Sequence, residues 1–152
     1  MADIESKDKK QKWFYSDIVK DHFLKPRNLA EDDNMVKEIN PDGIGEVGSP
    51  ACGDVMKMWI KIGDGRIKKC LWKTFGCASA IASTSMLSVM ITENNGMKIE
   101  DALKLRPKDI LERLHGLPKI KIHCSVLGDQ ALRAAINDYF KRTKQEDRMV
   151  KV

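Results

Sequence analysis

The feature that most constrains the fold is a pair of extended segments joined by a glycine-rich turn. Between residues 55 and 62, apolar side chains recur at every second position, and Gly63-Asp64-Gly65 ends the alternation. A period of two is typical of a strand with one buried face, and a short glycine-containing turn favours an antiparallel hairpin. We therefore predict that residues 66–75 return as a second strand. The buried face of that second strand stays open, because Leu71 and Trp72 are both large and apolar. The side chains expected on one face of the first strand are those of Met56, Met58, Ile60 and Ile62.

Around this hairpin, the apolar spacing predicts helices. Ser16 can cap a short helix that stops near Pro26, and the polar stretch over 28–48 is expected to be mostly loop, with a short strand over 44–47. Apolar residues three and four apart indicate the remaining helices. Those are expected over 77–91, 99–105, 107–115 and 125–142. The predicted fold class is α+β, a small antiparallel sheet of about three strands covered by helices.

Length and composition limit the class of protein. A chain of 152 residues suits one domain, and no apolar run approaches the roughly 20 residues that span a bilayer. Residues 1–12 are charged and lack the apolar core of a secretory signal, so the expected location is cytoplasmic. We expect a disordered lead over 1–12, one domain over 13–143 and a frayed polar tail over 144–152. The net charge of +5 decides nothing by itself, and neither a membrane nor a nucleic acid is an expected partner.

The four cysteines carry the chemistry. In a reducing compartment, thiolate chemistry or metal binding is a better interpretation than disulfides. Cys77 opens a predicted helix and Cys124 directly precedes one, and a helix N-terminus favours a thiolate. Cys52 lies in a glycine-flanked loop that leads into a strand. Cys70 lies in mid-strand beside bulky apolar residues, where a small buried core residue is the better interpretation.

Two further side chains could join these thiolates around one metal centre. Asp54 stands two residues after Cys52, so both would point the same way in a strand, and His123 adjoins Cys124. Thiolates suit zinc and iron–sulfur centres. No Cys-x-x-Cys occurs, however, so the spacing alone leaves a shared site and separate buried cysteines as open alternatives. A mixed donor set would make a more labile centre than four thiolates, as suits a centre meant for release.

Four motifs make the chain resemble the IscU/NifU-type iron–sulfur cluster assembly scaffolds. The resemblance runs from about Tyr15 to Tyr139 and keeps the motifs in the family's order. The motifs are Tyr15-Ser16-Asp17 with Pro26-Arg27-Asn28, Gly48-Ser49-Pro50-Ala51-Cys52-Gly53-Asp54-Val55, Lys73-Thr74-Phe75-Gly76-Cys77-Ala78-Ser79-Ala80-Ile81-Ala82-Ser83, and Lys121-Ile122-His123-Cys124-Ser125. Four such motifs across most of a domain are highly specific.

The resemblance implies the fold of the NifU N-terminal domain and a set of cluster ligands. By that likeness Cys52, Cys77 and Cys124 bind a [2Fe–2S] cluster, and Asp54 or His123 supplies the fourth contact. Family members also bind Zn²⁺ in the same pocket when they carry no cluster.

The resemblance also implies an assembly cycle in which the scaffold itself catalyses no reaction. A cysteine desulfurase of the IscS/NifS kind passes persulfide sulfur to a scaffold cysteine, Fe²⁺ joins it, and the finished cluster moves to an apo acceptor protein. Cys124 is our first choice as sulfur acceptor, because it borders a loop and a helix start. Lys121 would orient the site or balance its charge. Two copies sharing one cluster would form a homodimer.

Departures from the family pattern separate its types. The SufU type carries a longer insertion between the second and third cysteines and lacks a histidine before the third, where this chain has His123. NifU continues into further cluster-binding domains, so a free-standing IscU-like scaffold fits better. The chaperone-recognition loop, usually Leu-Pro-Pro-Val-Lys, reads Leu117-Pro118-Lys119-Ile120-Lys121 here, which argues against dedicated Hsp70-type handling. Two other functions remain as alternatives: a sulfurtransferase-like enzyme in which Cys124 relays persulfide, and a structural zinc protein with a basic surface.

Overall fold

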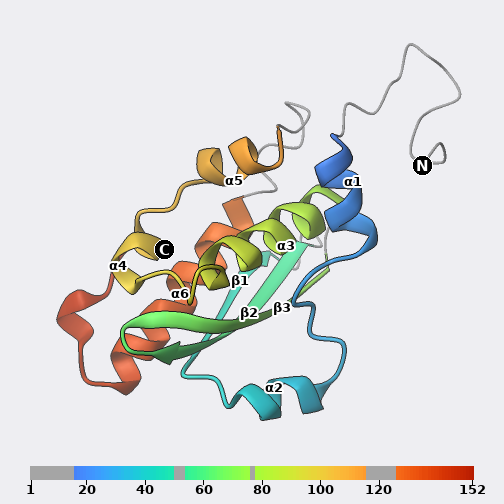
Figure 1. Ribbon diagram of the computed structural model, residues 1–152. Coiled ribbons are helices and arrows are strands. Elements are labelled where there is room, and N and C mark those ends of the chain that lie inside the picture. The colour runs from blue at the N-terminus through green and yellow to red at the C-terminus, as the bar shows by residue number, and fades with distance from the viewer. Residues whose placement is uncertain (1–15, 50–53, 76–77, 116–125) are drawn as a thin grey trace, which may run out of the picture.

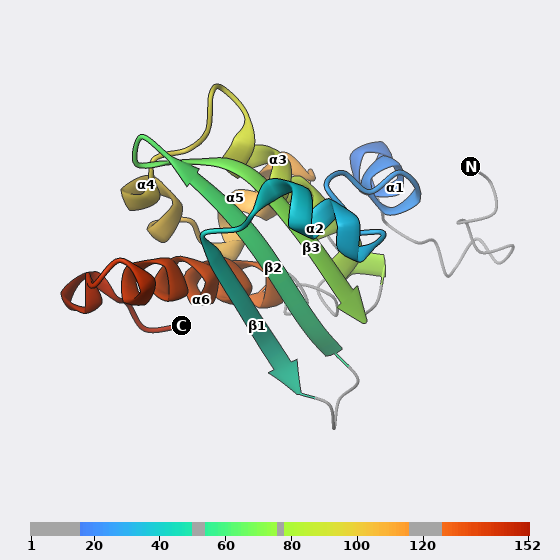
Figure 2. The same ribbon diagram turned by 90° about the horizontal axis from the view of Figure 1, so that it is seen from below.

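A three-stranded antiparallel sheet carries helices on both faces (Figure 1). The protein is seen in a computed structural model that describes residues 16–49, 54–75, 78–115 and 126–152. In chain order the elements are α1 (Asp17–Leu24), α2 (Asp33–Ile39), β1 (Gly43–Ser49), β2 (Asp54–Gly63), β3 (Arg66–Phe75), α3 (Ala78–Thr92), α4 (Ile99–Leu103), α5 (Pro107–Arg113), α6 (Val126–Arg142) and the 3-10 turn η5 (Glu146–Arg148). Helices α3 and α6 cover one face and α2 lies across the other, as the view from below also shows (Figure 2). The predicted α+β class is confirmed.

The hairpin of β2 and β3 forms as predicted, and its register decides the open question of facing. Met58 pairs with Trp72, and Trp59 pairs with Leu71. Trp72 is fully buried in the main core with Met58, whereas Leu71 belongs to a separate cluster on the opposite face. The facing of the alternating strand is confirmed. Met56, Met58 and Ile60 are fully buried, and Ile62 packs against the same core.

The prediction of loop over 28–48 is wrong in part, because this stretch contains both α2 and β1. Asp32 caps α2 by accepting a hydrogen bond from the backbone N–H of Met35 at 3.0 Å. Asn40 ends the helix in a left-handed conformation with φ of 48°. The apolar side chains of α2 pack on the face of the sheet opposite the main core, against Trp59 and Leu71. That cluster consists of Ala30, Trp59 and Leu71 with Met35, Val36, Ile39 and Ile44 packed against it.

Strand β1 is longer than the predicted 44–47, because two glycines let α6 lie directly on it. A methyl group at Gly45 would lie 2.3 Å from the carbonyl oxygen of Ala131, and one at Gly43 would lie 2.2 Å from that of Ala135. Only glycine permits so close an approach. The sequence of β1 lacks a clear apolar alternation, because glycines rather than bulky apolar side chains occupy the positions that face α6.

The predicted helices α1, α3 and α6 are confirmed within a residue or two, and α4 and α5 end two residues earlier than predicted. Pro107 begins α5 as expected. Four hydroxyl side chains in the middle of α3 are fully buried within an otherwise apolar helix. These side chains belong to Ser83, Thr84, Ser85 and Ser88. Within the described ranges, no helix is long and apolar enough to cross a membrane.

The polar tail after Thr143 packs on α6, which differs from the predicted frayed segment. The Asn137 side chain donates to the carbonyl of Val150 at 2.7 Å and accepts from its N–H at 2.9 Å. Arg148 stacks over the Phe140 ring at 4.6 Å and pairs with Glu100 at 2.9 Å. The polar composition of the tail does not show this attachment, because the hydrogen-bonding partner, the Asn137 amide, lies on α6.

Candidate functional site

The described ends of three elements gather at one end of the sheet. Ser49, the last residue of β1, pairs with Asp54, the first residue of β2. Val55 in turn pairs with Phe75, the last residue of β3. The segments 50–53 and 76–77 therefore leave the described structure from adjacent strand ends, and α3 starts directly after the second of them.

Helix α6 brings a third segment to the same end. Because Ala131 lies against Gly45 and Ala135 against Gly43, α6 runs antiparallel to β1, and its first residues lie toward Ser49. Near its start, Gly128 lies on α3, where an added methyl group would be 3.0 Å from the Thr84 hydroxyl. The described start of α6 therefore lies toward the Ser49 end of β1 and packs against α3 at Thr84.

The predicted site residues belong to these three segments. Cys52, Cys77, Lys121, His123 and Cys124 lie outside the described residues. Asp54 is placed by its backbone as the first residue of β2. The fold therefore brings together the strand ends and the helix start that flank these segments, while the set of cluster ligands stays a prediction.

Cys70 is separate from this end of the sheet. It pairs with Ile60 in mid-strand, five residues before Phe75, which corresponds to about 17 Å along a strand. Its side chain is 3% exposed, and burial raises the pKa of the thiol well above its usual range. The interpretation of Cys70 as a small core residue is confirmed. Across the residues that the structure describes, no cluster of three or more His, Cys, Asp or Glu side chains could hold a metal ion.

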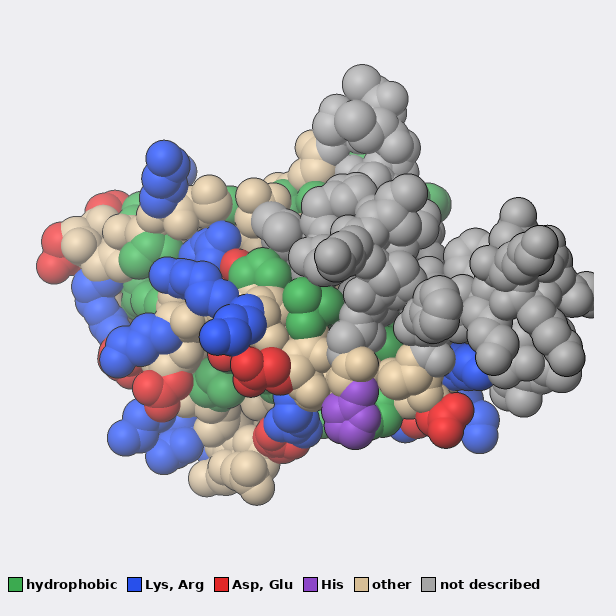
Figure 3. All heavy atoms as spheres, turned by 90° about the horizontal axis from the view of Figure 1, so that it is seen from above, with side chains coloured by type: hydrophobic (Ala, Val, Ile, Leu, Met, Phe, Trp, Pro, Cys, Tyr) green, Lys and Arg blue, Asp and Glu red, His purple; other side chains and the backbone are tan. Residues whose placement is uncertain are grey.

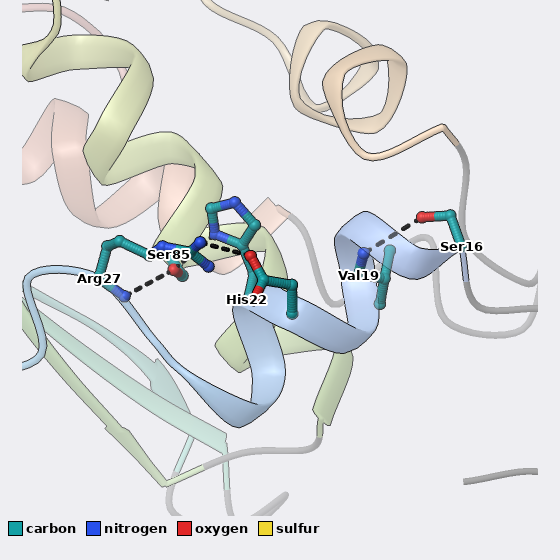
Figure 4. A network of polar contacts seen from close by, with 6 residues as sticks. Ser16, Val19, His22, Arg27 and Ser85 are labelled. Carbon is teal, nitrogen blue, oxygen red and sulfur yellow. Dashed lines mark hydrogen bonds and ion pairs between the residues drawn. The ribbon is translucent and has the colours of Figure 1, made fainter. Parts of the chain in front are cut away.

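A buried polar network joins α1 to the middle of α3 (Figure 4). Nδ1 of His22 lies 2.7 Å from the Ser85 hydroxyl, which also accepts the backbone N–H of Arg27 at 2.9 Å. Burial, followed by the nearby Arg27 guanidinium, lowers the pKa of His22. The Ser16 hydroxyl accepts from the N–H of Val19 at 3.1 Å and donates to the carbonyl of Leu114, so it ties α1 to the end of α5.

This network gives a structural reason for the motif Pro26-Arg27-Asn28. The carbonyl of Arg27 accepts a hydrogen bond from the Trp72 indole at 2.8 Å, and the Asn28 amide donates to the Ser88 hydroxyl at 2.9 Å. Asn28 holds a positive φ of 63°, a conformation that asparagine tolerates better than most residues. Sequence reasoning missed this role. The available signal was the run of hydroxyl side chains along one apolar helix.

Phe75 is a second feature that the sequence did not single out. Its side chain is 66% exposed at the last position of β3, next to the segment with Cys77. The Lys73 ammonium lies 5.9 Å from the centre of its ring. An exposed aromatic side chain beside the convergent strand ends is available for contact with another molecule.

The chain belongs to the family of NifU-like N-terminal domains, whose sequence model matches residues 14–146. The resemblance stated from the motifs is thereby confirmed. Solved structures support the same fold. The N-terminal part of a NifU-like protein from Brucella abortus has a TM-score of 0.60 at 16% identity, covering 84% of this chain and 94% of the other.

Curated relatives are much closer in sequence. The chain is 47% identical over 135 residues to the iron–sulfur cluster assembly scaffold protein IscU 1 of Archaeoglobus fulgidus, covering 89% of this chain and 82% of the relative. It is 44% identical over 133 residues to the protein IscU of Escherichia coli K12, covering 87% and 97%. The chain is thus similar over most of its length to proteins named as scaffolds.

Proposed function

We propose that this protein is a scaffold on which an iron–sulfur cluster is assembled and from which it is transferred. The observation that carries the proposal is the convergence of Ser49, Asp54 and Phe75 with the starts of α3 and α6. Each of the three cysteine-bearing segments begins or ends at this place. The relatives' names, which describe iron–sulfur cluster assembly scaffolds, support the same function.

The proposed ligands are three cysteines, one in each of these segments, and one weaker donor. Cys52, Cys77 and Cys124 would bind a [2Fe–2S] cluster as thiolates, with Asp54 or His123 in the fourth position. An oxygen or nitrogen donor in place of a fourth thiolate makes a less uniform cage, which favours release. The cluster is the cargo of this protein, and the same donors would hold Zn²⁺ in its absence.

The proposed sulfur acceptor is Cys124, with Lys121 as an auxiliary cation. The thiolate attacks the outer sulfur of a persulfide on a cysteine desulfurase, so one S–S bond forms as another breaks. Each transferred sulfur needs two electrons to become sulfide, which a thiol or an electron-transfer protein must supply. The remaining proposed partners are apo acceptor proteins and a second copy of the chain sharing one cluster. A reducing compartment such as the cytoplasm would keep the thiols free.

The decisive experiment is anaerobic reconstitution of the full-length protein. The metal-free chain is incubated with a desulfurase, cysteine, Fe²⁺ and a thiol reductant, and visible absorption, iron and acid-labile sulfide are measured. We expect charge-transfer bands with equal iron and sulfide. The variants Cys52→Ser, Cys77→Ser and Cys124→Ser should each lose the charge-transfer bands, whereas Cys70→Ala should keep them.

The two alternatives give different results in the same experiment. A sulfurtransferase-like enzyme would carry persulfide on Cys124 without retaining iron. A structural zinc protein would unfold when a chelator removes zinc. The scaffold proposal is refuted if no acid-labile sulfide accumulates, or if a formed cluster never moves to an apo acceptor.

A further inference from the structure

The outer edge of β1 offers backbone groups to a further strand. β1 lies at one margin of the sheet, because the strand order is β1-β2-β3 (Figure 2). The backbone N–H of Ile44 donates to Oδ2 of Asp138 at 2.8 Å, so it points away from β2. Residues two apart in a strand point the same way, and the pairing of β1 with β2 is regular along the whole strand. The N–H groups of Glu46 and Gly48 therefore also point outward.

Four backbone groups along this edge have no hydrogen-bond partner among the described residues. They are the carbonyls of Ile44 and Glu46 and the N–H groups of Glu46 and Gly48. The two carbonyls point outward because each is opposite to the next N–H in a planar trans peptide, and the N–H groups of Gly45 and Val47 face β2. Glu46 and Gly48 are exposed. Such a row of unpaired groups is a template for one more strand.

Other surfaces select a partner less clearly. The outer edge of β3 is already occupied at two places. Trp72 exchanges backbone hydrogen bonds with Asn28 and Ala30, and the N–H of Ile67 donates to the carbonyl of Met97. On the described part of the face seen from above, blue Lys and Arg side chains are intermixed with red Asp and Glu side chains (Figure 3). The edge of β1, in contrast, fixes both the direction and the spacing of the groups that a partner must supply.

The side chain of Glu46 determines which charge an added strand should carry. It is 59% exposed, and its carboxylate lies 3.9 Å from the ammonium of Lys57, the residue opposite it on β2. A residue of an added strand would lie directly opposite Glu46 on its other side. Opposite charges in such a cross-strand pair are favourable, and like charges are unfavourable. Lysine or arginine therefore suits this position.

A second copy of the chain fits the same edge less well. Two copies of β1 can use all four groups of each strand in one antiparallel register, which is centred on Glu46. That register places the two Glu46 carboxylates directly opposite each other, as a like-charge pair. The edge therefore favours a partner with a different sequence.

We propose that β1 binds an extended segment of a partner protein as an added antiparallel strand, with a basic residue opposite Glu46. The four backbone groups hold the segment whatever its sequence, and the basic residue supplies the specificity. Antiparallel pairing is the commoner kind. The added strand would lie beside the end of β1 at Ser49, after which the sequence continues to Cys52. Binding at this edge requires no cluster, so it is tested separately from the scaffold function.

The test is an NMR titration of the metal-free, isotope-labelled, full-length protein with two blocked heptapeptides. One peptide is Thr-Thr-Val-Lys-Thr-Val-Thr, and the other carries glutamate at the central position. We expect the lysine peptide to shift the amide signals of Glu46 and Gly48 saturably, and more than those of Gly45 and Val47, whose N–H groups face β2. The lysine peptide should bind about fivefold more tightly than the glutamate peptide, because a favourable cross-strand pair replaces an unfavourable one.

Variants of Glu46 separate the backbone contribution from that of charge. Glu46→Lys should reverse the preference between the peptides, whereas Glu112→Lys, the same charge change at an exposed position of α5, should leave it unchanged. Glu46→Pro removes one outward N–H at an edge position where proline is tolerated, and it should abolish binding. Glu46→Thr keeps that N–H and should bind without the original preference. If the proline variant does not fold, the reversal by Glu46→Lys decides.

Three results of the titration would overturn the proposal. They are that neither peptide binds, that both bind equally, or that Glu46→Lys behaves like the Glu112→Lys control. The proposal is also overturned if the free protein sediments as a dimer and its Glu46 and Gly48 amides are already protected from hydrogen exchange. A second copy would then occupy the edge.

Discussion

Nδ1 of His22 and the hydroxyl of Ser85 lie 2.7 Å apart and join α1 to α3. Burial lowers the pKa of His22, so we assign the neutral imidazole to this contact, in which the Ser85 oxygen also accepts the N–H of Arg27. The family motif around Arg27 thus depends on one uncharged imidazole.

The folded protein should lose stability as the pH falls through the range where unfolded histidine takes up a proton. The lowered pKa of His22 means that the unfolded chain binds this proton first, so stability is complete above about pH 6.5 and declines below it. Denaturant unfolding at several values from pH 7 to pH 5.5 measures the effect. His22→Asn, which keeps an acceptor, should flatten the slope. An equal slope in both proteins would contradict the assignment.

Gly45→Ala should destabilise the protein by about 3 kcal/mol or more, since the new methyl group would meet the backbone of α6. Neither backbone can move without separating β1 from α6. Gly65→Ala is the matched control, because a methyl group there has open space and only the positive φ of 70° to accommodate. It should cost about 1 kcal/mol. Thermal unfolding compares the two, and equal effects would argue against the close approach.

Cys70→Ala should leave the amount of reconstituted cluster unchanged. The thiol lies in the core, and burial keeps it protonated, so it has no thiolate to offer iron. Loss of the buried sulfur should cost about 1 kcal/mol of unfolding free energy. Iron and sulfide analysis after reconstitution checks the first statement. A fall in iron content at full folding would give Cys70 a role in the site.

Asp54→Ala should keep the fold but slow the transfer of a cluster to an apo acceptor. A carboxylate is a poorer partner for iron than the thiolates beside it, so its removal should leave a more tightly held cluster. The transfer rate measured by the acceptor's absorption tests this. Glu46→Ala, which removes an exposed carboxylate from β1, is the control. Transfer from the Asp54 variant at the wild-type rate would count against the proposed ligand.

Local patterns predicted much of the fold. The hairpin, its turn and the helices α1, α3 and α6 follow from periods of two and about 3.6 residues and from residues that cap or end an element. These signals act over a few residues, so a single sequence shows them directly. The cysteine motifs likewise identify the candidate ligands, because the chemistry of a thiolate belongs to the residue itself.

Contacts between distant parts of the chain decided the rest. Strand β1 exists because Gly43 and Gly45 admit α6, and the tail is held because Asn137 meets Val150. No local pattern records such partners. The sequence by itself determined the candidate cluster ligands and the elements with local signals, namely the hairpin and the helices α1, α3 and α6. Only the tertiary structure decided that Ser49, Asp54 and Phe75 lie together at one end of the sheet, toward which α6 begins, since strand register and helix packing depend on surfaces that meet after folding.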